Sequence, residues 1–240
     1  MKNFFKNACD ELQLDITEKQ IEQFFIYKDL LLQWNEKMNL TAIVEEKDVI
    51  LKHFIDCLTV AKFRNLDGKN IADIGTGAGF PGLVLKIYFE NSNMCLVDAL
   101  NKRINFLKEV SKQINVKNIN FIHSRAEDLG KEKDFRESFD FCVSRAVANL
   151  SVLAEYDLPF VKIGGEFIAL KGPSVNEEIE DAKNAIKILG GEISDIKTIK
   201  IPFSDIEHKL VFIQKLRQTP NQYPRKGTKI SKNPIKWHRY

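Results

Sequence analysis

A short strand, a glycine-rich turn and a helix are predicted in succession between residues 70 and 89, and this succession limits the fold more than any other feature. Residues 70–74 form an apolar run, and residues 83–89 have helical spacing. The turn between them contains four glycines, Gly75, Gly77, Gly79 and Gly82. Glycine allows positive φ angles, and its missing Cβ lets a cofactor approach backbone N–H groups at the start of a helix. We therefore expect a cofactor site at this turn.

From residue 70 onward, apolar runs alternate with runs of helical spacing. The strand-like runs are 70–74, 94–97, 119–123, 139–144, 165–170, 193–201 and 209–214. The helical runs are 83–89, 102–114, 150–161 and 176–189, with a less regular turn near 127–135. This alternation predicts an α/β fold with a parallel, doubly wound sheet. Because only residues 202–208 separate the last two strands, these should pair antiparallel as a hairpin, which favours a methyltransferase sheet over a dehydrogenase sheet.

The first 62 residues are predicted to be helical. Thr17 and Gln20 have the spacing of a capping box before a long amphipathic stretch. Residues 48–63 resume helical spacing and place His53 and Asp56 on one face. These two side chains could close the helix against the body of the protein, or they could position a substrate or cofactor. We expect residues 1–62 to pack on a cofactor-binding domain of residues 63–217, followed by an irregular basic extension, residues 218–240, that lies on the body.

Composition argues against membrane insertion, a disulfide framework and a metal site. The longest apolar runs are far shorter than the roughly 18 residues of a membrane span. Residues 1–11 carry charge too soon and too often for a signal peptide. Four cysteines and four histidines are dispersed without a C-x-x-C pair. We expect a cytoplasmic protein without a metal.

Charge is distributed unevenly along the chain. Residues 218–240 contain six basic residues and no acidic one, whereas the preceding residues contain 30 basic and 33 acidic residues. A basic segment interleaved with Tyr223 and Trp237 suits RNA, because cations neutralise phosphates and aromatic rings stack on bases. A solvated run of charge is the simpler alternative. The candidate RNA-binding residues are Lys171, Arg225, Lys226 and Lys229.

The turn alone does not decide between cofactors. Gly77, Gly79 and Gly82 fit the dinucleotide pattern G-x-G-x-x-G, and Asp98 follows at the distance of an acid that binds ribose hydroxyls. Three features favour S-adenosylmethionine instead: Asp73 inside the strand, the absence of a second nucleotide-binding half, and the hairpin. Asp73 could also cap local amides without touching a cofactor.

Two further positions follow predicted strands at the carboxyl edge of the sheet. Ala126 and Glu127 would contact an adenine, by backbone and side chain respectively, although an exposed loop acid is a common alternative. Arg145 would point into the cleft, where a buried cation needs a carboxylate partner. That partner could be the methionine carboxylate of the cofactor or a nearby acid.

Seven motifs occur together in one order. They are Asn39-Leu-Thr41, His53-x-x-Asp56, Asp73-x-Gly-Thr-Gly-x-Gly-Phe-Pro-Gly82, Asp98-x-x-x-Lys-Arg103, Arg125-Ala-Glu127, Ser144-Arg-Ala146 and Ala169-Leu-Lys-Gly172. From about residue 20 to 217 the chain resembles the small-subunit ribosomal RNA methyltransferase G family, also called glucose-inhibited division protein B. The resemblance implies a class I S-adenosylmethionine-dependent methyltransferase fold and methylation of N7 of a guanine in the 530 loop of 16S rRNA.

The resemblance also implies site residues and partners. The family's cofactor contacts fall on Gly75, Phe80, Ala126, Glu127 and Arg145. The residues argued above add Asp73, Gly77, Gly79 and Asp98. The expected partner is 16S rRNA, the 30S subunit or its precursor, bound by a monomer, with neither DNA nor a membrane as partner.

The expected chemistry needs no general base, because guanine N7 carries a free lone pair. We therefore name no catalytic residue, and expect catalysis by positioning, which is worth roughly 7–11 kcal/mol for well-oriented reactants. Three alternatives stay open. They are a methyltransferase with a small-molecule acceptor, an NAD-dependent oxidoreductase, and a regulatory module that binds the cofactor without catalysis.

Overall fold

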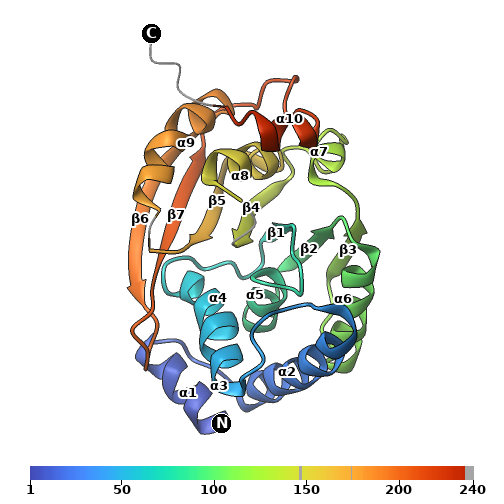
Figure 1. Cartoon of the computed structure of the whole chain (residues 1–240), viewed down its shortest axis with the longest axis vertical. Helices are drawn as coiled ribbons and strands as arrows, with labels where there is room; N and C mark the ends of the chain where they lie inside the picture. The colour runs from blue at the N-terminus through green and yellow to red at the C-terminus, as the bar shows by residue number, and fades with distance from the viewer. Residues whose placement is uncertain (146–147, 174, 236–240) are drawn as a thin grey trace.

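The computed structural model describes residues 1–145, 148–173 and 175–235. Within these residues one sheet of seven strands has the order β3-β2-β1-β4-β5-β7-β6 (Figure 1). The strands are β1 (Asn70–Ile74), β2 (Asn93–Asp98), β3 (Ile119–His123), β4 (Phe139–Arg145), β5 (Val161–Lys171), β6 (Gly191–Lys200) and β7 (Glu207–Lys215). β1 to β5 pair in parallel, and β7 is antiparallel to both β5 and β6. The predicted doubly wound sheet and its final hairpin are confirmed.

Helices cover both faces of the sheet. One face packs on α5 (Gly82–Tyr88), α6 (Asn101–Gln113) and the N-terminal helices, and the other on α7 (Ala126–Leu129), α8 (Leu150–Asp157) and α9 (Asn176–Ile188). Successive strand residues point to opposite faces, so Ile71 joins the first core and Ala72 the second. A helix predicted over residues 150–161 is too long: α8 ends at Asp157 because Pro159 lacks the N–H that a further turn needs.

The N-terminal helices share a core with the sheet. α1 (Lys2–Glu11) and α2 (Glu18–Met38) bury Phe5 and Phe24 in the same cluster as Leu83 of α5. The capping box is present, since Gln20 N donates to Thr17 Oγ1 at 3.2 Å and Thr17 N donates to Gln20 Oε1 at 2.9 Å. Among the described residues, no helix is long and apolar enough to cross a membrane.

The segment predicted as one helix over residues 48–63 is divided into four short pieces. They are α3 (Glu46–Val49), the π-helical turn η1 (Ile50–Ile55), α4 (Asp56–Leu58) and the 3₁₀ turn η2 (Thr59–Lys62). A π-helical turn widens the helix locally and is frequent at functional sites. It contains His53, so the local geometry of this side chain differs from that of a regular helix.

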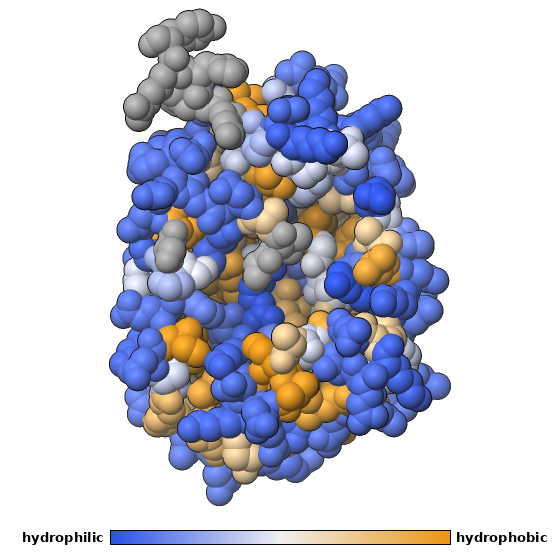
Figure 2. Space-filling view, in the orientation of Figure 1, coloured by the Kyte–Doolittle hydropathy of each residue, from blue (hydrophilic) through white to orange (hydrophobic). Residues whose placement is uncertain are grey.

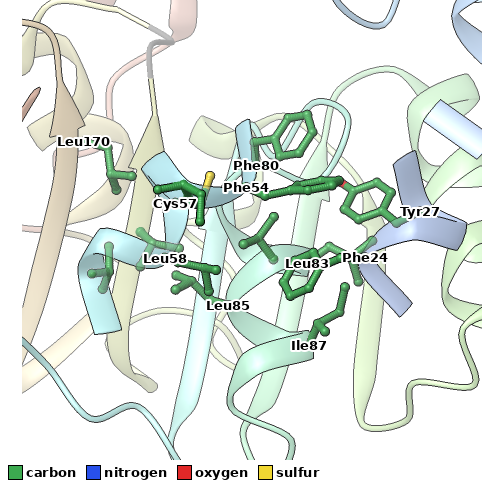
Figure 3. Packing of buried hydrophobic residues seen from close by; sticks show 14 of the residues in the cluster. Phe24, Tyr27, Phe54, Cys57, Leu58, Phe80, Leu83, Leu85, Ile87 and Leu170 are labelled. Atoms are coloured by element: carbon green, nitrogen blue, oxygen red, sulfur yellow. The ribbon is translucent and has the colours of Figure 1, made fainter. Parts of the chain in front are cut away.

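An aromatic cluster joins these helices to the glycine-rich turn. Tyr27 of α2 lies 5.3 Å from Phe54 of η1 and 5.7 Å from Phe80 of the turn, measured between ring centroids. Figure 3 shows the three rings next to one another above the packed aliphatic core. The Tyr27 hydroxyl also donates to the Ala78 carbonyl. The N-terminal helices therefore help to hold the turn in place.

The segment after β7 crosses the end of the molecule that carries α7 and α8. It is irregular apart from α10 (Gly227–Lys232), which lies beside both helices (Figure 1). Ile230 is fully buried, and Ile235 packs in the second core.

Candidate active site

A cavity of about 190 Å³ opens at the carboxyl ends of β1, β2 and β3. Four predicted cofactor residues line it, Gly75, Asp98, Ala126 and Glu127. Leu153, Tyr156 and Asp157 of α8 line the opposite wall. The sequence-predicted residues of three different strand ends are therefore brought together. The side of the molecule seen in Figure 1 and Figure 2 is hollowed near its centre, where apolar side chains are visible among hydrophilic ones.

Asp73 stabilises the glycine-rich turn from within the strand. Its Oδ2 accepts hydrogen bonds from the Thr76 hydroxyl at 2.6 Å and from Gly82 N at 2.7 Å. A Cβ at position 82 would lie 2.6 Å from this oxygen, so only glycine fits there. Asp73 thus caps local amides, as the alternative reading of the sequence proposed. Its Oδ1 is buried without a partner, and burial raises the pKa of this carboxyl to about 7. Contact with a cofactor remains a prediction.

Gly79 and Gly77 of the turn differ in why the structure favours glycine at each position. Gly79 has φ +101°, and a Cβ there would lie 2.5 Å from the Tyr27 hydroxyl and 2.8 Å from Leu107 Cδ2. Close packing therefore demands glycine at this position. Gly77 has φ +62° and open space where a Cβ would be, with no neighbouring atom closer than 4.0 Å. The open space beside Gly77 is consistent with the approach of a cofactor.

Asp98 connects β2 to the turn that follows β1. Its Oδ2 accepts from Gly77 N at 3.0 Å and from Arg103 Nη1 at 3.2 Å, and its Oδ1 accepts from Leu100 N at 2.8 Å. Although it is almost completely buried, Asp98 still lines the cavity. The carboxylate can therefore position the turn as well as face a ribose.

Asp157 is a residue of the cavity wall that the sequence analysis does not identify. Neither carboxyl oxygen has a hydrogen-bond partner, and the side chain is fully buried. Burial raises the pKa of this carboxyl well above its usual value. An acid inside the apolar helical run 150–158 is the only signal in the sequence that could point to it.

A second cavity, of about 390 Å³, lies at the carboxyl ends of β4 and β5 and against η1. Arg145 is one of the residues that line it. Its Nη1 donates to the Lys52 carbonyl at 2.8 Å and to Asp56 Oδ2 at 2.9 Å. Its guanidinium lies 4.8 Å from the centre of the Phe80 ring. The predicted carboxylate partner of Arg145 in this structure is therefore a nearby acid, Asp56.

His53 is held by the same arginine. Arg145 Nη2 lies 3.0 Å from His53 Nδ1, and His53 Nε2 lies 2.8 Å from Thr41 Oγ1. Because the guanidinium can only donate, Nδ1 accepts and Nε2 carries the proton. Burial and the charge of Arg145 lower the pKa of His53 to about 4, so the ring is neutral at pH 7. The ring also stacks on Phe80 at a centroid distance of 4.4 Å.

His208 completes this cluster and is not identified from the sequence. It lies at the start of β7, and its Nδ1 bonds to Asp56 Oδ1. Asp56 is only 2% exposed, so Arg145 and His208 together satisfy a buried carboxylate. His53 and Asp56 do share a helix face, as predicted, but they meet through Arg145.

The predicted cofactor residues consequently fall into separate groups. Phe80 and Arg145 lie together with His53 beside the second cavity. Gly75, Asp98, Ala126 and Glu127 line the first cavity. Ala146 of the Ser-Arg-Ala motif lies outside the described residues, as does Trp237 of the basic extension.

The predicted RNA-binding residues differ in their surroundings. Lys171 lines the second cavity, where Nζ bonds to Glu178 Oε1 at 2.5 Å and to the Ala148 carbonyl at 2.7 Å. Arg225 is paired with buried Glu155. Lys226 and Lys229 are exposed on and beside α10. RNA contact by any of the four remains a prediction. In the described parts of the chain, no group of three potential ligands could hold a metal ion.

Solved structures with the same fold define the class. A SAM-dependent methyltransferase from Aquifex aeolicus matches with a TM-score of 0.52 and 17% identity, over 72% of this chain and 94% of that chain. TYW2 of M. jannaschii, in complex with AdoMet, matches with a TM-score of 0.53 and 14% identity, over 73% and 80% of the two chains. With its strand order and terminal hairpin, the protein has the class I fold of S-adenosylmethionine-dependent methyltransferases.

Sequence comparisons then define the family. A model described as "rRNA small subunit methyltransferase G" matches residues 20–209. Ribosomal RNA small subunit methyltransferase G of Alkaliphilus metalliredigens (strain QYMF) is 52% identical over 236 residues, which cover 98% of this chain and 99% of that protein. The chain belongs to the rRNA small subunit methyltransferase G family, and the resemblance found in the sequence is confirmed.

Proposed function

We propose that this protein transfers the methyl group of S-adenosylmethionine to N7 of a guanine in the 530 loop of 16S rRNA. Membership in the family supports a ribosomal RNA acceptor. The cofactor would occupy the first cavity, because three strand ends converge there with open space beside Gly77. Asp157, a buried carboxyl group without a partner in the wall of this cavity, also suits a ligand with hydrogen-bond donors such as the amino groups of S-adenosylmethionine.

Different residues of the first cavity would contact different parts of the cofactor. Asp98, at the end of β2, is placed to accept hydrogen bonds from the ribose hydroxyls. Ala126 and Glu127, at the start of α7, would contact the adenine. Gly75 and Gly77 would lie along the amino-acid end, where backbone can approach most closely.

The second cavity would receive the guanine. It lies at the same edge of the sheet, since β1 pairs with both β2 and β4. Lys52, Arg145 and Lys171 line it, and although each is paired with an acid, their N–H groups are donors of the kind that suits the O6 atom of guanine. Phe80, from the glycine-rich turn, is stacked on His53 and lies under the Arg145 guanidinium.

The observation that carries the N7 assignment is the state of the acids and bases in this second cluster. His53 is neutral and uses both ring nitrogens, and both oxygens of Asp56 are occupied. Neither of these two groups is free to remove a proton. His208, the third group of this cluster, is held by Asp56 through Nδ1 alone, so the N7 assignment rests on His53 and Asp56. An acceptor that loses no proton fits such a site, and N7 of guanine is one.

The reaction would then depend on alignment. S-Adenosylmethionine supplies a methyl group on a sulfonium: the bond to sulfur breaks as the bond to N7 forms, and positive charge passes to the purine. The chain's own task is to hold the base in line and exclude water, a contribution of about 7–11 kcal/mol in well-oriented reactions. We further propose that the enzyme works as a cytoplasmic monomer on the 30S subunit or its precursor.

Methyl transfer from labelled S-adenosylmethionine tests this function. The acceptors are 30S particles and naked 16S rRNA, both from cells that lack the gene. We expect label in a single N7-methylguanosine of the 530 loop. Measurable cofactor binding without label in either acceptor would contradict an RNA substrate and favour a small-molecule acceptor.

A further inference from the structure

The basic extension is attached to the helices that form the cofactor cavity. Arg225 donates to both carboxylate oxygens of Glu155 on α8, with Nε at 2.8 Å from Oε1 and Nη2 at 2.6 Å from Oε2. The Arg225 backbone N also donates to Oε1 at 2.8 Å. Glu155 is 0% exposed, so this is a buried, bidentate, charge-assisted contact. Arg225 is thus neutralised within the protein, whereas a side chain that binds RNA phosphates is expected to be exposed and unpaired.

A second contact reaches a predicted adenine-binding residue directly. Gly227, at the start of α10, lies against the carboxyl group of Glu127. A Cβ at position 227 would be 2.2 Å from Glu127 Oε1 and 2.9 Å from Cδ. The backbone of the extension therefore limits where the Glu127 carboxylate can lie.

A third contact fixes the path of the extension over α7. Arg136 donates to the carbonyl oxygens of Thr219 at 2.7 Å and Tyr223 at 2.9 Å, and also to the Gly130 carbonyl at 3.0 Å. Pro224 packs against Gly130, where an added Cβ would be 3.3 Å from its Cγ. These bonds satisfy backbone carbonyls that no regular element pairs, so the irregular path is well defined.

The helices held in this way carry the cavity on their other sides. Leu153, Tyr156 and Asp157 of α8 line the cofactor cavity, within two residues of Glu155, and α7 contributes Ala126 and Glu127. The cavity wall between α7 and α8 thus lies between the sheet and the extension.

We propose that residues 218–235 are part of the cofactor site. Arg225 is a positioning residue that acts through Glu155, and the backbone at Gly227 limits where the Glu127 carboxylate can lie. The extension would thereby raise the affinity for the adenosyl end of the cofactor. This inference rests on the proposed cofactor site and is independent of which RNA or small molecule receives the methyl group.

The test measures binding of S-adenosylhomocysteine to the full-length protein by calorimetry. Arg225→Ala should raise the Kd about tenfold, a typical size for coupling between contacts, and Arg225→Lys should recover part of the loss. The matched control is Arg217→Ala, because Arg217 donates to the Lys187 carbonyl on α9, away from this cavity. Its Kd should equal that of the wild type.

Gly227→Ala provides a second variant that keeps the buried ion pair. Its added methyl group would displace the Glu127 carboxylate, so the Kd should also rise. Thr228→Ala, at the next and exposed position of α10, is its control. In steady-state assays, both test variants should raise the KM for S-adenosylmethionine and leave kcat at saturation close to that of the wild type.

The outcomes separate this inference from the proposed function. If the wild type binds the ligand and both variants lower only the melting temperature, with Kd and KM unchanged, the extension is a structural support and the inference is wrong. If the wild type itself does not bind S-adenosylhomocysteine, the proposed cofactor site fails. Linkage requires the reverse effect as well: bound ligand should slow hydrogen exchange at the Arg225 amide, and an unchanged rate would count against the inference.

Discussion

Arg145 and Asp56 form an ion pair with an N–O distance of 2.9 Å that connects the end of β4 to α4. Both side chains are largely buried, and each has further partners, His53 for the arginine and His208 for the aspartate. These four side chains therefore connect the N-terminal helices, the parallel sheet and the C-terminal hairpin beside the second cavity.

Removing one partner of this pair should destabilise the fold strongly. Asp56→Ala leaves the buried guanidinium without its carboxylate, which typically costs about 3–5 kcal/mol. Urea unfolding measures the loss. The control is Asp48→Ala, which breaks an exposed ion pair with Lys52 and should change the free energy of unfolding by less than about 1 kcal/mol. Equal losses in the two variants would contradict the role assigned to Asp56.

His53 should stay neutral well below the pH at which histidine normally titrates. Its pKa is lowered to about 4 in the folded protein. Between about pH 6.5 and pH 4, the unfolded chain therefore binds a proton at this ring and the folded protein does not. The stabilising contribution of neutral His53 is complete above pH 6.5 and is lost as the pH falls toward 4. NMR of the ring nitrogens should show the Nε2–H tautomer from pH 8 to 5. Titration of this ring near pH 6.5 would show that it is not buried against Arg145.

Asp157 should produce the opposite dependence. Burial raises the pKa of this carboxyl, so the folded protein keeps a proton that the unfolded chain has released above about pH 4. Its contribution to stability therefore falls as the pH rises from about 4. Asp157→Asn should flatten this decline and increase stability at pH 8 by an amount on the order of 1 kcal/mol. Asp134→Asn, at an exposed position, should change nothing; a parallel pH profile in both variants would refute the burial argument.

The glycines of the turn should separate packing from binding. Gly79→Ala places a methyl group against Tyr27 and Leu107, so we expect a loss of about 1–3 kcal/mol from overpacking, in addition to backbone strain. Gly77→Arg enters open space, so it should abolish cofactor binding with a smaller loss of stability, about 1–2 kcal/mol for the positive φ. Thermal unfolding and calorimetry distinguish the two. Cofactor binding that survives in Gly77→Arg would exclude this turn as the site.

Local sequence patterns predict most of the sheet. β1 and β3 are predicted to the residue, because each is an apolar run bounded by polar or turn-forming residues. The π-helical turn η1 is not predicted, since its hydrogen bonding differs from that of an α-helix only through tertiary packing, while the residue spacing looks helical. The end of α8 could have been placed correctly by giving Pro159 more weight.

The site is predicted less completely than the sheet. Strand ends identify Gly75, Asp98, Glu127 and Arg145, because the carboxyl ends of parallel strands meet at one edge. His208 escapes such reasoning: it reaches Asp56 only through the antiparallel register of β5 and β7. Charge composition likewise marks Arg225 as basic but does not reveal that buried Glu155 neutralises it.

The central claim is methylation of guanine N7 in ribosomal RNA, and the most direct measurement is chemical mapping of N7-methylguanosine in 16S rRNA from cells with and without the gene. The account predicts one modified guanine in the 530 loop that disappears on deletion and returns with the wild-type gene but not with Arg145→Ala. The same modification in deletion cells, or its absence from wild-type cells, would contradict the account.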